Sequence, residues 1–182
     1  MLLYITSNSD KIFIAKSRLK DYGISFEAKA VNMVEIQSTS TEEIAQHKAK
    51  QAFEMLRTPL FVTDDGWSIP ALNGFPGPYM KYMNDWLTPT DFLNLMKDHT
   101  DKRIIHTVTL CYTDGENSRT FTTSYQGHFI DSIQGNGFAA MRVVSMTPDG
   151  KSVASYLEEK KNPVPNNELW KEFANWYKSI SK

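Results

Sequence analysis

The feature that most constrains the fold is a change of hydrophobic period near the middle of the chain. Before it, short apolar runs at residues 2–5 and 60–63 alternate with segments whose apolar residues recur at helical spacing. After it, segments typical of strands are joined by tight turns at Asp114-Gly115 and Pro148-Asp149-Gly150. Helices mixed with strands, followed by a run of strands, indicate an α/β protein built around a mixed sheet.

The individual elements follow from this period and from capping residues. Ser40 with Glu43 marks one helix start, and Thr88 with Pro89 marks another. The expected helices cover residues 9–22, 42–57, 79–86, 89–97 and 167–180. The expected strands cover residues 2–5, 26–34, 60–63, 103–112, 120–130, 141–146 and 152–157, with an irregular loop at 73–78.

Composition excludes several classes of protein. The net charge of −1 gives no overall basic field to hold a nucleic acid polymer, whereas a small anion bound by a few lysines is compatible with it. Cys111 is the only cysteine, which excludes an internal disulfide and fits the reducing cytoplasm. Because no apolar run reaches about 18 residues, no membrane-spanning helix is expected. We expect a single domain over residues 1–182.

A polar loop lies between the first expected strand and the first expected helix. Free backbone N–H groups and the helix dipole favour an anion at such a junction. Thr6, Ser7 and Asn8 add side-chain donors, and Lys11 adds a positive charge near the first turn. The loop is therefore a candidate phosphate site, although the same residues are also common as a plain helix cap. It is not a Walker A loop, because no Gly-Lys-Ser or Gly-Lys-Thr occurs.

Charged residues also interrupt two apolar patterns. Lys48 lies on the apolar stripe of the second expected helix, so its ammonium needs an anionic partner or a path to solvent. Asp64 and Asp65 lie near the C-terminal end of the third expected strand, where adjacent side chains point to opposite faces. One can bind a metal or act as a base while the other caps a turn, and Glu35 could supply a second carboxylate for Mg²⁺. An Asp-Asp-Gly turn without a chemical role fits the same residues.

Taken in order, these motifs resemble the inosine triphosphate pyrophosphatase family, hydrolases of noncanonical purine nucleoside triphosphates. The resemblance rests on Thr6-x-Asn8-x-x-Lys11, Glu35-x-Gln37, Lys48-Ala49, Asp64 and Leu72-Asn73-Gly74-Phe75-Pro76-Gly77-Pro78-Tyr79. It is strong over residues 1 to about 115 and weak beyond. It implies an elongated mixed sheet flanked by helices, two lobes with a central cleft, and a homodimer.

The resemblance also implies which residues form the site. Glu35 and Asp64 would bind Mg²⁺, and the catalytic residues would be these two and Lys11, with Asp64 orienting or deprotonating the attacking water. The substrate-binding residues would be Thr6, Ser7, Asn8, Lys11, Lys48, Asp65, Lys81, Phe138 and Lys161. Thr63 stands where the family usually has Glu or Asp, and Asp65 where it has Ser or Thr, so the acidic pair is shifted by one residue.

The second half of the chain departs from the family at the residues that read the base. The family has Gly-Phe-Gly-Tyr/Trp-Asp-Pro, whereas this chain has Gly137-Phe138-Ala139-Ala140-Met141-Arg142. The family's Lys-Asn-x-x-Ser-His-Arg is reduced to Lys161-Asn162. Replacement contacts suggested by position alone are Arg142, Gln134 and Asn136. A pocket that loses its hydrogen-bonding partners loses discrimination between bases.

The predicted function is that of a Mg²⁺-dependent pyrophosphatase. It would split a nucleoside or deoxynucleoside triphosphate, noncanonical and modified ones included, into a monophosphate and pyrophosphate, with altered base specificity. The alternative is a catalytically inactive nucleotide-binding or interaction protein on the same fold. The loss of both base-reading motifs and the presence of Thr63 favour that alternative.

Overall fold

The computed structural model describes residues 1–181, which form two compact units. Within the described residues, the first unit comprises Met1–Asp65, Val108–Thr123 and residues 167–181, and the second comprises Gly66–Thr107 and Ser124–Asn166. The strands follow the order β2 (Glu27–Lys29), β1 (Leu3–Ile5), β3 (Leu60–Ser68), β5 (Arg103–Thr113), β6 (Ser118–Phe129) and β7 (Val144–Ser145), with β4 (Pro76–Gly77) beside β3. Strand β1 is parallel to β2 and β3, whereas β3 with β4 and β6 with β7 are antiparallel. The predicted α/β class with a mixed sheet flanked by helices is confirmed.

The elements fall into three groups. The first unit holds β1 (Leu3–Ile5), α1 (Ser9–Lys20), β2 (Glu27–Lys29), α2 (Thr41–Leu56) and α6 (Glu168–Ile180). The second unit holds the 3₁₀ turns η1 (Pro70–Leu72) and η2 (Ala140–Arg142), with β4 (Pro76–Gly77), α3 (Met80–Trp86), α4 (Pro89–Met96), β7 (Val144–Ser145) and α5 (Val153–Glu158). The chain passes between the units within β3 (Leu60–Ser68), β5 (Arg103–Thr113) and β6 (Ser118–Phe129).

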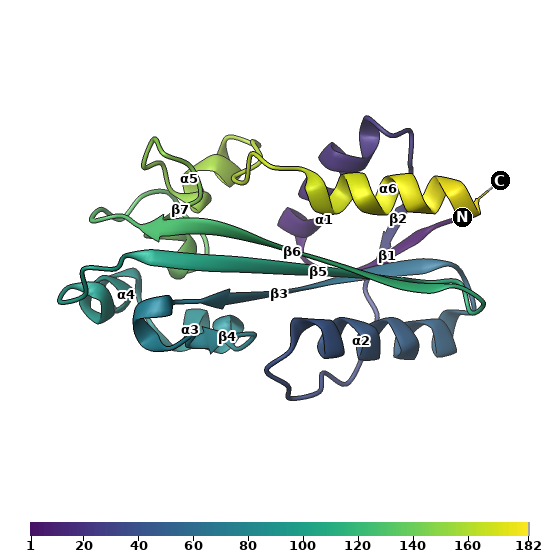
Figure 1. The fold of residues 1–182 in the computed structure, drawn as a ribbon, viewed down its shortest axis with the longest axis horizontal. Coiled ribbons are helices and arrows are strands. Elements are labelled where there is room, and N and C mark those ends of the chain that lie inside the picture. The colour runs from purple at the N-terminus through teal and green to yellow at the C-terminus, as the bar shows by residue number, and fades with distance from the viewer. Residues whose placement is uncertain (182) are drawn as a thin grey trace. The chain divides into compact units, whose positions relative to one another are not determined.

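Helices cover both faces of the strands in the first unit. Figure 1 shows α1 and α6 on one side of these strands and α2 on the other. Because side chains alternate along a strand, Tyr4 and Phe61 pack toward α1 and α6, whereas Leu60 and Val62 pack toward α2. The same alternation decides which helix each polar side chain of β3 can meet.

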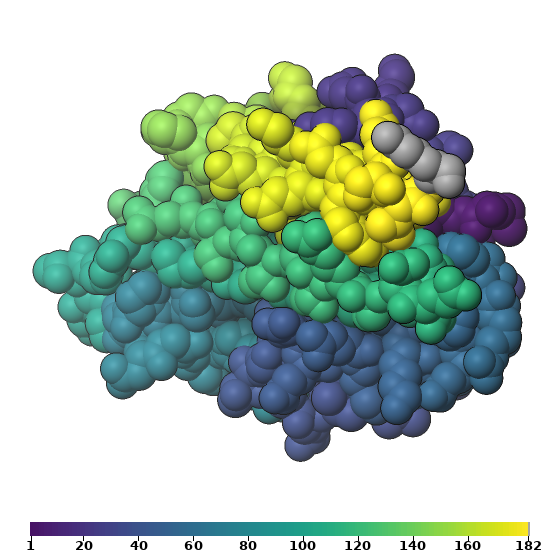
Figure 2. Space-filling view, turned by 45° about the vertical axis from the view of Figure 1, so that its right-hand side comes forward, coloured from purple at the N-terminus to yellow at the C-terminus, as the bar shows by residue number. Residues whose placement is uncertain are grey.

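The face beneath α6 is an aromatic core. Phe173 of α6 is fully buried, with its ring next to Phe61, Tyr112 and Phe121 at centroid distances of 5.3, 6.3 and 5.8 Å. Figure 2 shows α6 as a yellow ridge lying beside the green end of the β5–β6 hairpin. Tyr4 and Phe61 stack below it at 4.4 Å, so the strands and the last helix share one apolar layer.

Helix ends agree with the local signals. The side chain of Ser40 accepts the Glu43 N–H at the start of α2, and Thr88 forms a complete capping box with Asp91 at the start of α4. Gly23, with a φ of +66°, follows α1 in the left-handed conformation that glycine adopts without strain. The predicted helices at residues 9–22, 42–57, 79–86, 89–97 and 167–180 therefore exist within one or two residues.

Four strand predictions need correction. Strand β3 continues to Ser68 instead of ending at residue 63, so the two aspartates lie inside a strand and form no turn. Residues 152–157 form helix α5 because Ser152 caps it and Val153, Ala154 and Leu157 pack at helical spacing. The predicted strands at 26–34 and 141–146 shrink to β2 and β7, and η2 occupies the start of the latter range.

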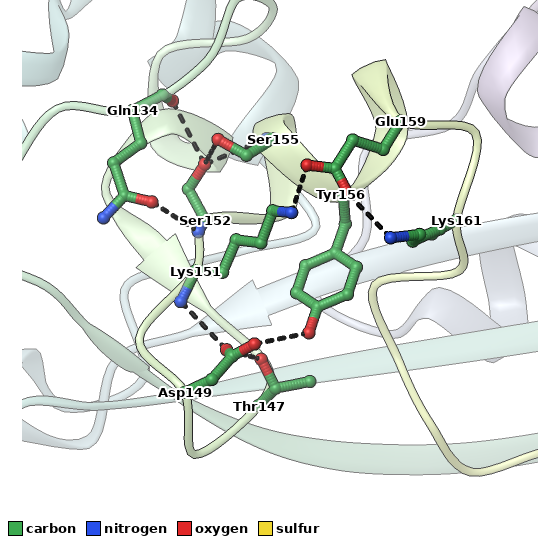
Figure 3. Close-up of polar contacts among 9 residues, drawn as sticks. All are labelled: Gln134, Thr147, Asp149, Lys151, Ser152, Ser155, Tyr156, Glu159 and Lys161. Atoms are coloured by element: carbon green, nitrogen blue, oxygen red, sulfur yellow. Dashed lines mark hydrogen bonds and ion pairs between the residues drawn. The ribbon is translucent and has the colours of Figure 1, made fainter.

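The turn before α5 is held by polar contacts on Asp149 (Figure 3). Its carboxylate accepts the Thr147 hydroxyl at 2.5 Å, the Lys151 N–H at 3.0 Å and the Tyr156 hydroxyl at 2.7 Å. Hydrogen bonds to the ionised carboxylate, above all that from Thr147, lower the pKa of Asp149 to about 2. The predicted turn at residues 148–150 is thereby tied to the helix that follows it.

The aromatic layer gives a stability prediction. The Phe173→Ala substitution should lower the free energy of unfolding by about 3–5 kcal/mol, because it removes a fully buried ring and leaves a cavity. Urea denaturation checks this, with the exposed Lys171→Ala on the same helix as control. A loss below about 1 kcal/mol would mean that the layer can collapse around the missing ring.

The Asp149 turn gives a pH prediction. Since its pKa is lower in the folded protein than the usual 3.9 or so, its stabilising effect is present above about pH 4 and fades toward pH 2. Asp149→Asn should therefore be less stable than wild type at pH 6, and the difference should shrink as the pH falls toward 2. Urea unfolding at several pH values measures it, with the exposed Asp131→Asn as the matched carboxylate control. A difference that does not vary with pH would contradict it.

Candidate functional site

The candidate site lies in the first unit, where β3 presents Asp64 and Asp65 to opposite faces. Asp64 follows Val62 toward α2 and meets Lys48, whereas Asp65 follows Phe61 and Thr63 toward α1 and pairs with Lys11. The prediction that the two aspartates do different jobs agrees with this arrangement. Helices α1 and α2 thus each contribute one lysine to one aspartate.

Lys48 joins two carboxylates. Its Nζ lies 2.5 Å from Glu35 Oε1 and 2.6 Å from Asp64 Oδ1. Lys48 projects from the buried stripe of α2, and its side chain is only 18% exposed. Of the two alternatives left open by the sequence, an anionic partner or a path to solvent, the structure shows the first, with two carboxylates. The geometry shows that Glu35 and Asp64, which are separated by 29 positions in the chain, converge on one cation.

The environment makes Asp64 a stronger base than a free aspartate. Burial raises its pKa, and the attraction of Lys48 opposes this shift without cancelling it. Only 9% of its side chain is exposed, whereas that of Glu35 is 48% exposed. Glu35 and Asp64 together can hold a cation near the protein surface. Asp64, the buried one with the raised pKa, also has affinity for a proton.

The opposite face of β3 carries a second charged group. Lys11 forms an ion pair with Asp65, and the Tyr4 hydroxyl lies 2.5 Å from the Thr63 hydroxyl on the same face. Burial lowers the pKa of Lys11, but the charges of Asp65 and Tyr4 and the hydrogen bond to Asp65 together outweigh burial, so the pKa is raised. Burial raises the pKa of Tyr4 to about 12, so its hydroxyl stays protonated beside Thr63. Sequence reasoning missed this Tyr4 contact, for which alternation on β1 is the only signal.

The polar loop after β1 is a well-formed helix start. Asn8 Oδ1 accepts the backbone N–H groups of Asp10 and Lys11 at 2.9 and 3.1 Å, and Thr6 Oγ1 accepts that of Asn8 at 3.1 Å. Ser7 is exposed beside them. The plain capping role left open by the sequence is therefore real, and the same junction brings Lys11 to Asp65 one turn into α1.

The donor set fits a hard divalent cation. Glu35 and Asp64 supply carboxylate oxygens, the ligand type that Mg²⁺ prefers, and two protein carboxylates are usual when water and phosphate complete the shell. The ammonium of Lys48 donates a hydrogen bond to each of these two carboxylates, so both already contact one positive charge. In residues 1–181 no group of three or more His, Cys, Asp and Glu side chains is arranged to bind a metal, so a cage made of protein ligands alone is absent.

The remaining predicted residues belong to the second unit. Lys81 lies exposed on α3, Phe138 is 46% exposed, and Lys161 bonds Glu159 at 2.9 Å (Figure 3). Glu159 also pairs with Lys151, so two lysines share one carboxylate. All three residues are thus near or at the surface of their unit.

The replacement contacts suggested by position are engaged inside the second unit. Gln134 donates to Ser132 and Gly150 and accepts the Ser152 N–H, as part of Figure 3 shows. The backbone N–H and side-chain amide of Asn136 donate to Glu158, and Arg142 Nε donates to the Gly135 carbonyl at 2.8 Å. These bonds hold the loops together, which gives all three residues a structural role.

Comparisons with known proteins identify the family. The Ham1 family matches residues 2–165, well beyond residue 115, where the sequence motifs become weak. A relative from Methanopyrus kandleri, named dITP/XTP pyrophosphatase, is 33% identical over 98% of this chain and 96% of its own. A relative of the same name from Saccharolobus solfataricus is 29% identical over 98% and 94%.

A solved structure agrees at the level of the fold. The Ham1 protein of Staphylococcus aureus matches with a TM-score of 0.74 and 20% identity, covering 100% of this chain and 99% of that one. The family match spans most of the chain, and full-length relatives share about a third of their residues with it. The family predicted from the motifs is therefore confirmed, and the chain belongs to the Ham1 family.

Proposed function

We propose that this protein is a Mg²⁺-dependent nucleoside triphosphate pyrophosphatase that releases a nucleoside monophosphate and pyrophosphate. The observation that carries the proposal is the convergence of Glu35 and Asp64 on Lys48, with Lys11 held by the next residue of β3. The full-length relatives named dITP/XTP pyrophosphatase support the reaction class.

Glu35 and Asp64 would hold the metal. When bound there, Mg²⁺ would neutralise charge on the triphosphate and position it, as metals do in phosphoryl chemistry. Three carboxylates and two ammonium groups leave this site with one excess negative charge. A divalent cation reverses that sign, so the proposal explains how a site with Glu35, Asp64 and Asp65 can accept a polyanion.

The lysines and the helix start would bind the triphosphate. Lys48 would exchange its carboxylate partners for phosphate oxygens, and Lys11 would do the same from its pair with Asp65. Thr6 and Asn8 present the N-terminal end of α1, whose dipole favours phosphate, and Ser7 adds an exposed hydroxyl. Lys81 is proposed as a further positive contact, in line with the family resemblance.

The chemical step is a hydrolysis at the α-phosphorus. A water molecule attacks that phosphorus, the bond to the bridging oxygen toward the β-phosphorus breaks, and pyrophosphate leaves. Asp64, with its raised pKa, accepts the proton that the water loses. Lys11 and Lys48 stabilise the charge that builds on the phosphate oxygens.

The base preference is proposed to differ from that of the family. Phe138, partly exposed, would offer a face for stacking, and Lys161 a polar contact to the base. Since Gln134, Asn136 and Arg142 bond their own loops, they leave few donors to read a base edge. We therefore propose that the enzyme accepts a broader or different set of bases than its family does.

The homodimer and the cytoplasmic location stay predictions.

Pyrophosphate release across a panel of standard, deaminated and modified nucleoside triphosphates tests the function. The wild type should turn over at least one of them with Mg²⁺, and Asp64→Asn should lower kcat by about 100-fold or more, because the general base is lost. Asp98→Asn, an exposed aspartate on a turn, is the matched control and should keep full activity.

The outcomes distinguish a pyrophosphatase from a non-catalytic nucleotide-binding protein. A folded Asp64→Asn protein with full activity would remove this mechanism. Binding of nucleotides without turnover of any of them, with Mg²⁺ or Mn²⁺, would favour a non-catalytic nucleotide-binding protein on the same fold.

Metal removal gives an independent check. Chelation should abolish pyrophosphate release, and added Mg²⁺ should restore it. Because a ligand that binds only the folded state stabilises it, Mg²⁺ at 100 times its Kd should add about 2.7 kcal/mol to the wild type and far less to Asp64→Asn. Thermal unfolding with and without Mg²⁺ measures this difference, and equal stabilisation of both proteins would place the metal elsewhere.

A further inference from the structure

The position of Glu35 is not fixed by regular secondary structure. It lies between β2 and α2, in residues 30–40, which form neither helix nor strand. Its side chain is 48% exposed, so packing around it is incomplete. A carboxylate that must hold a metal within a few tenths of an ångström needs some other restraint.

The side chain of Gln51 supplies such a restraint at the preceding residue. Its Oε1 accepts the N–H of Val34 at 3.2 Å, and its Nε2 donates to the carbonyl of Val34 at 2.7 Å. The amide thus binds both backbone groups of one residue, as a neighbouring strand does in a sheet. Such a two-point contact fixes the orientation of the peptide groups from which Glu35 projects.

The amide of Gln51 is itself held. Its Nε2 also contacts Nδ1 of His47 at 2.8 Å, and because an amide nitrogen only donates, Nδ1 is the acceptor. Gln51 lies three residues after Lys48, on the same face of α2. One helix therefore carries both the ammonium that meets the Glu35 carboxylate and the amide that holds the backbone of Val34.

Side-chain packing does not fix the backbone next to Glu35. Val34 is 71% exposed, and the apolar contacts of the segment come from Val31 and Met33, on its N-terminal side. Helix α2, in contrast, is anchored in the core through buried residues at one face. The amide of Gln51 thus links the backbone of an irregular, exposed segment to a rigid helix at the residue before Glu35.

We infer that Gln51 is a positioning residue for the metal site, acting through the backbone of Val34 on Glu35. The inference rests on the proposed function, since it assigns Glu35 to the metal. Removal of the two hydrogen bonds should leave the fold intact and weaken the binding of a divalent cation.

The test uses Mn²⁺ alone as the probe, without nucleotide, on the full chain. Gln51→Met keeps the length and apolar stem but cannot make either hydrogen bond, and its Kd for Mn²⁺ by electron paramagnetic resonance should rise about 10-fold. Gln46→Met is the matched control, since Gln46 lies on the same helix and bonds Glu42 and Thr120 instead of the segment. It should leave the Kd unchanged.

A double variant separates positioning from general loosening. In a Glu35→Gln protein, the Gln51→Met change should have no further effect on Mn²⁺ binding, because both act through the same carboxylate. Gln51→Glu keeps the acceptor for the Val34 N–H and loses the donor, so it should give an intermediate Kd and covers the case in which Gln51→Met fails to fold.

The outcomes are distinct for the two proposals. An unchanged Kd in Gln51→Met, or equal effects with and without Glu35, would overturn the positioning role and leave the enzyme assignment intact. Weaker Mn²⁺ binding in a protein that never releases pyrophosphate would support the positioning role and overturn the enzyme. A wild type that does not bind Mn²⁺ would overturn the metal assignment and the positioning role together.

Discussion

The ion pair between Asp64 and Lys48 is the interaction on which the first unit depends. An aspartate inside a buried strand without a cation would carry an uncompensated charge, and breaking a buried pair typically costs about 3–5 kcal/mol. Lys48 reaches it because α2 packs on that face of β3 through small residues such as Ala45 and Ala49. The same pair draws in Glu35, so one structural requirement also assembles the proposed metal ligands.

Each face of β3 carries one aspartate paired with one lysine, but the surroundings of the two pairs differ. On the α1 face, Lys11 meets Asp65 beside a hydroxyl pair, over a layer of packed aromatic rings. On the α2 face, the partners are charged and one of them is half exposed. The proposed metal ligands therefore lie on the face whose outer carboxylate, Glu35, is half exposed, whereas on the α1 face the ion pair with Asp65 holds the Lys11 side chain.

Local signals were sufficient for most helices and for several site residues. Ser40 and Thr88 predicted helix starts because their partners lie within three residues. Lys48 interrupts an apolar stripe, which predicted either an anionic partner or a path to solvent, and the structure shows the partner. The length of β3 was missed because an Asp-Asp-Gly run resembles a turn until lysines from two distant helices neutralise it. Residues 152–157 were misread because a short apolar run fits a strand or a helix equally well.

Non-local geometry explains the rest. Nothing in the spacing of Glu35 and Asp64 shows that they meet, since an irregular segment and a whole helix lie between them. The structural roles of Gln134 and Asn136 were also hidden, because their partners, Ser152 and Glu158, come from a helix that the sequence pattern did not predict.

The alternation of β3 also changes the meaning of the shifted acidic pair. Thr63 and Asp65 have the same parity, so both side chains point to the face that carries Lys11. Relative to the family pattern, a carboxylate and a hydroxyl have exchanged places on one surface, and Asp64 has kept its own. In the sequence the acidic pair looks shifted by one residue. On this face of the strand the same two functional groups remain with their positions exchanged, so the carboxylate lies two residues, about 7 Å, further along the strand.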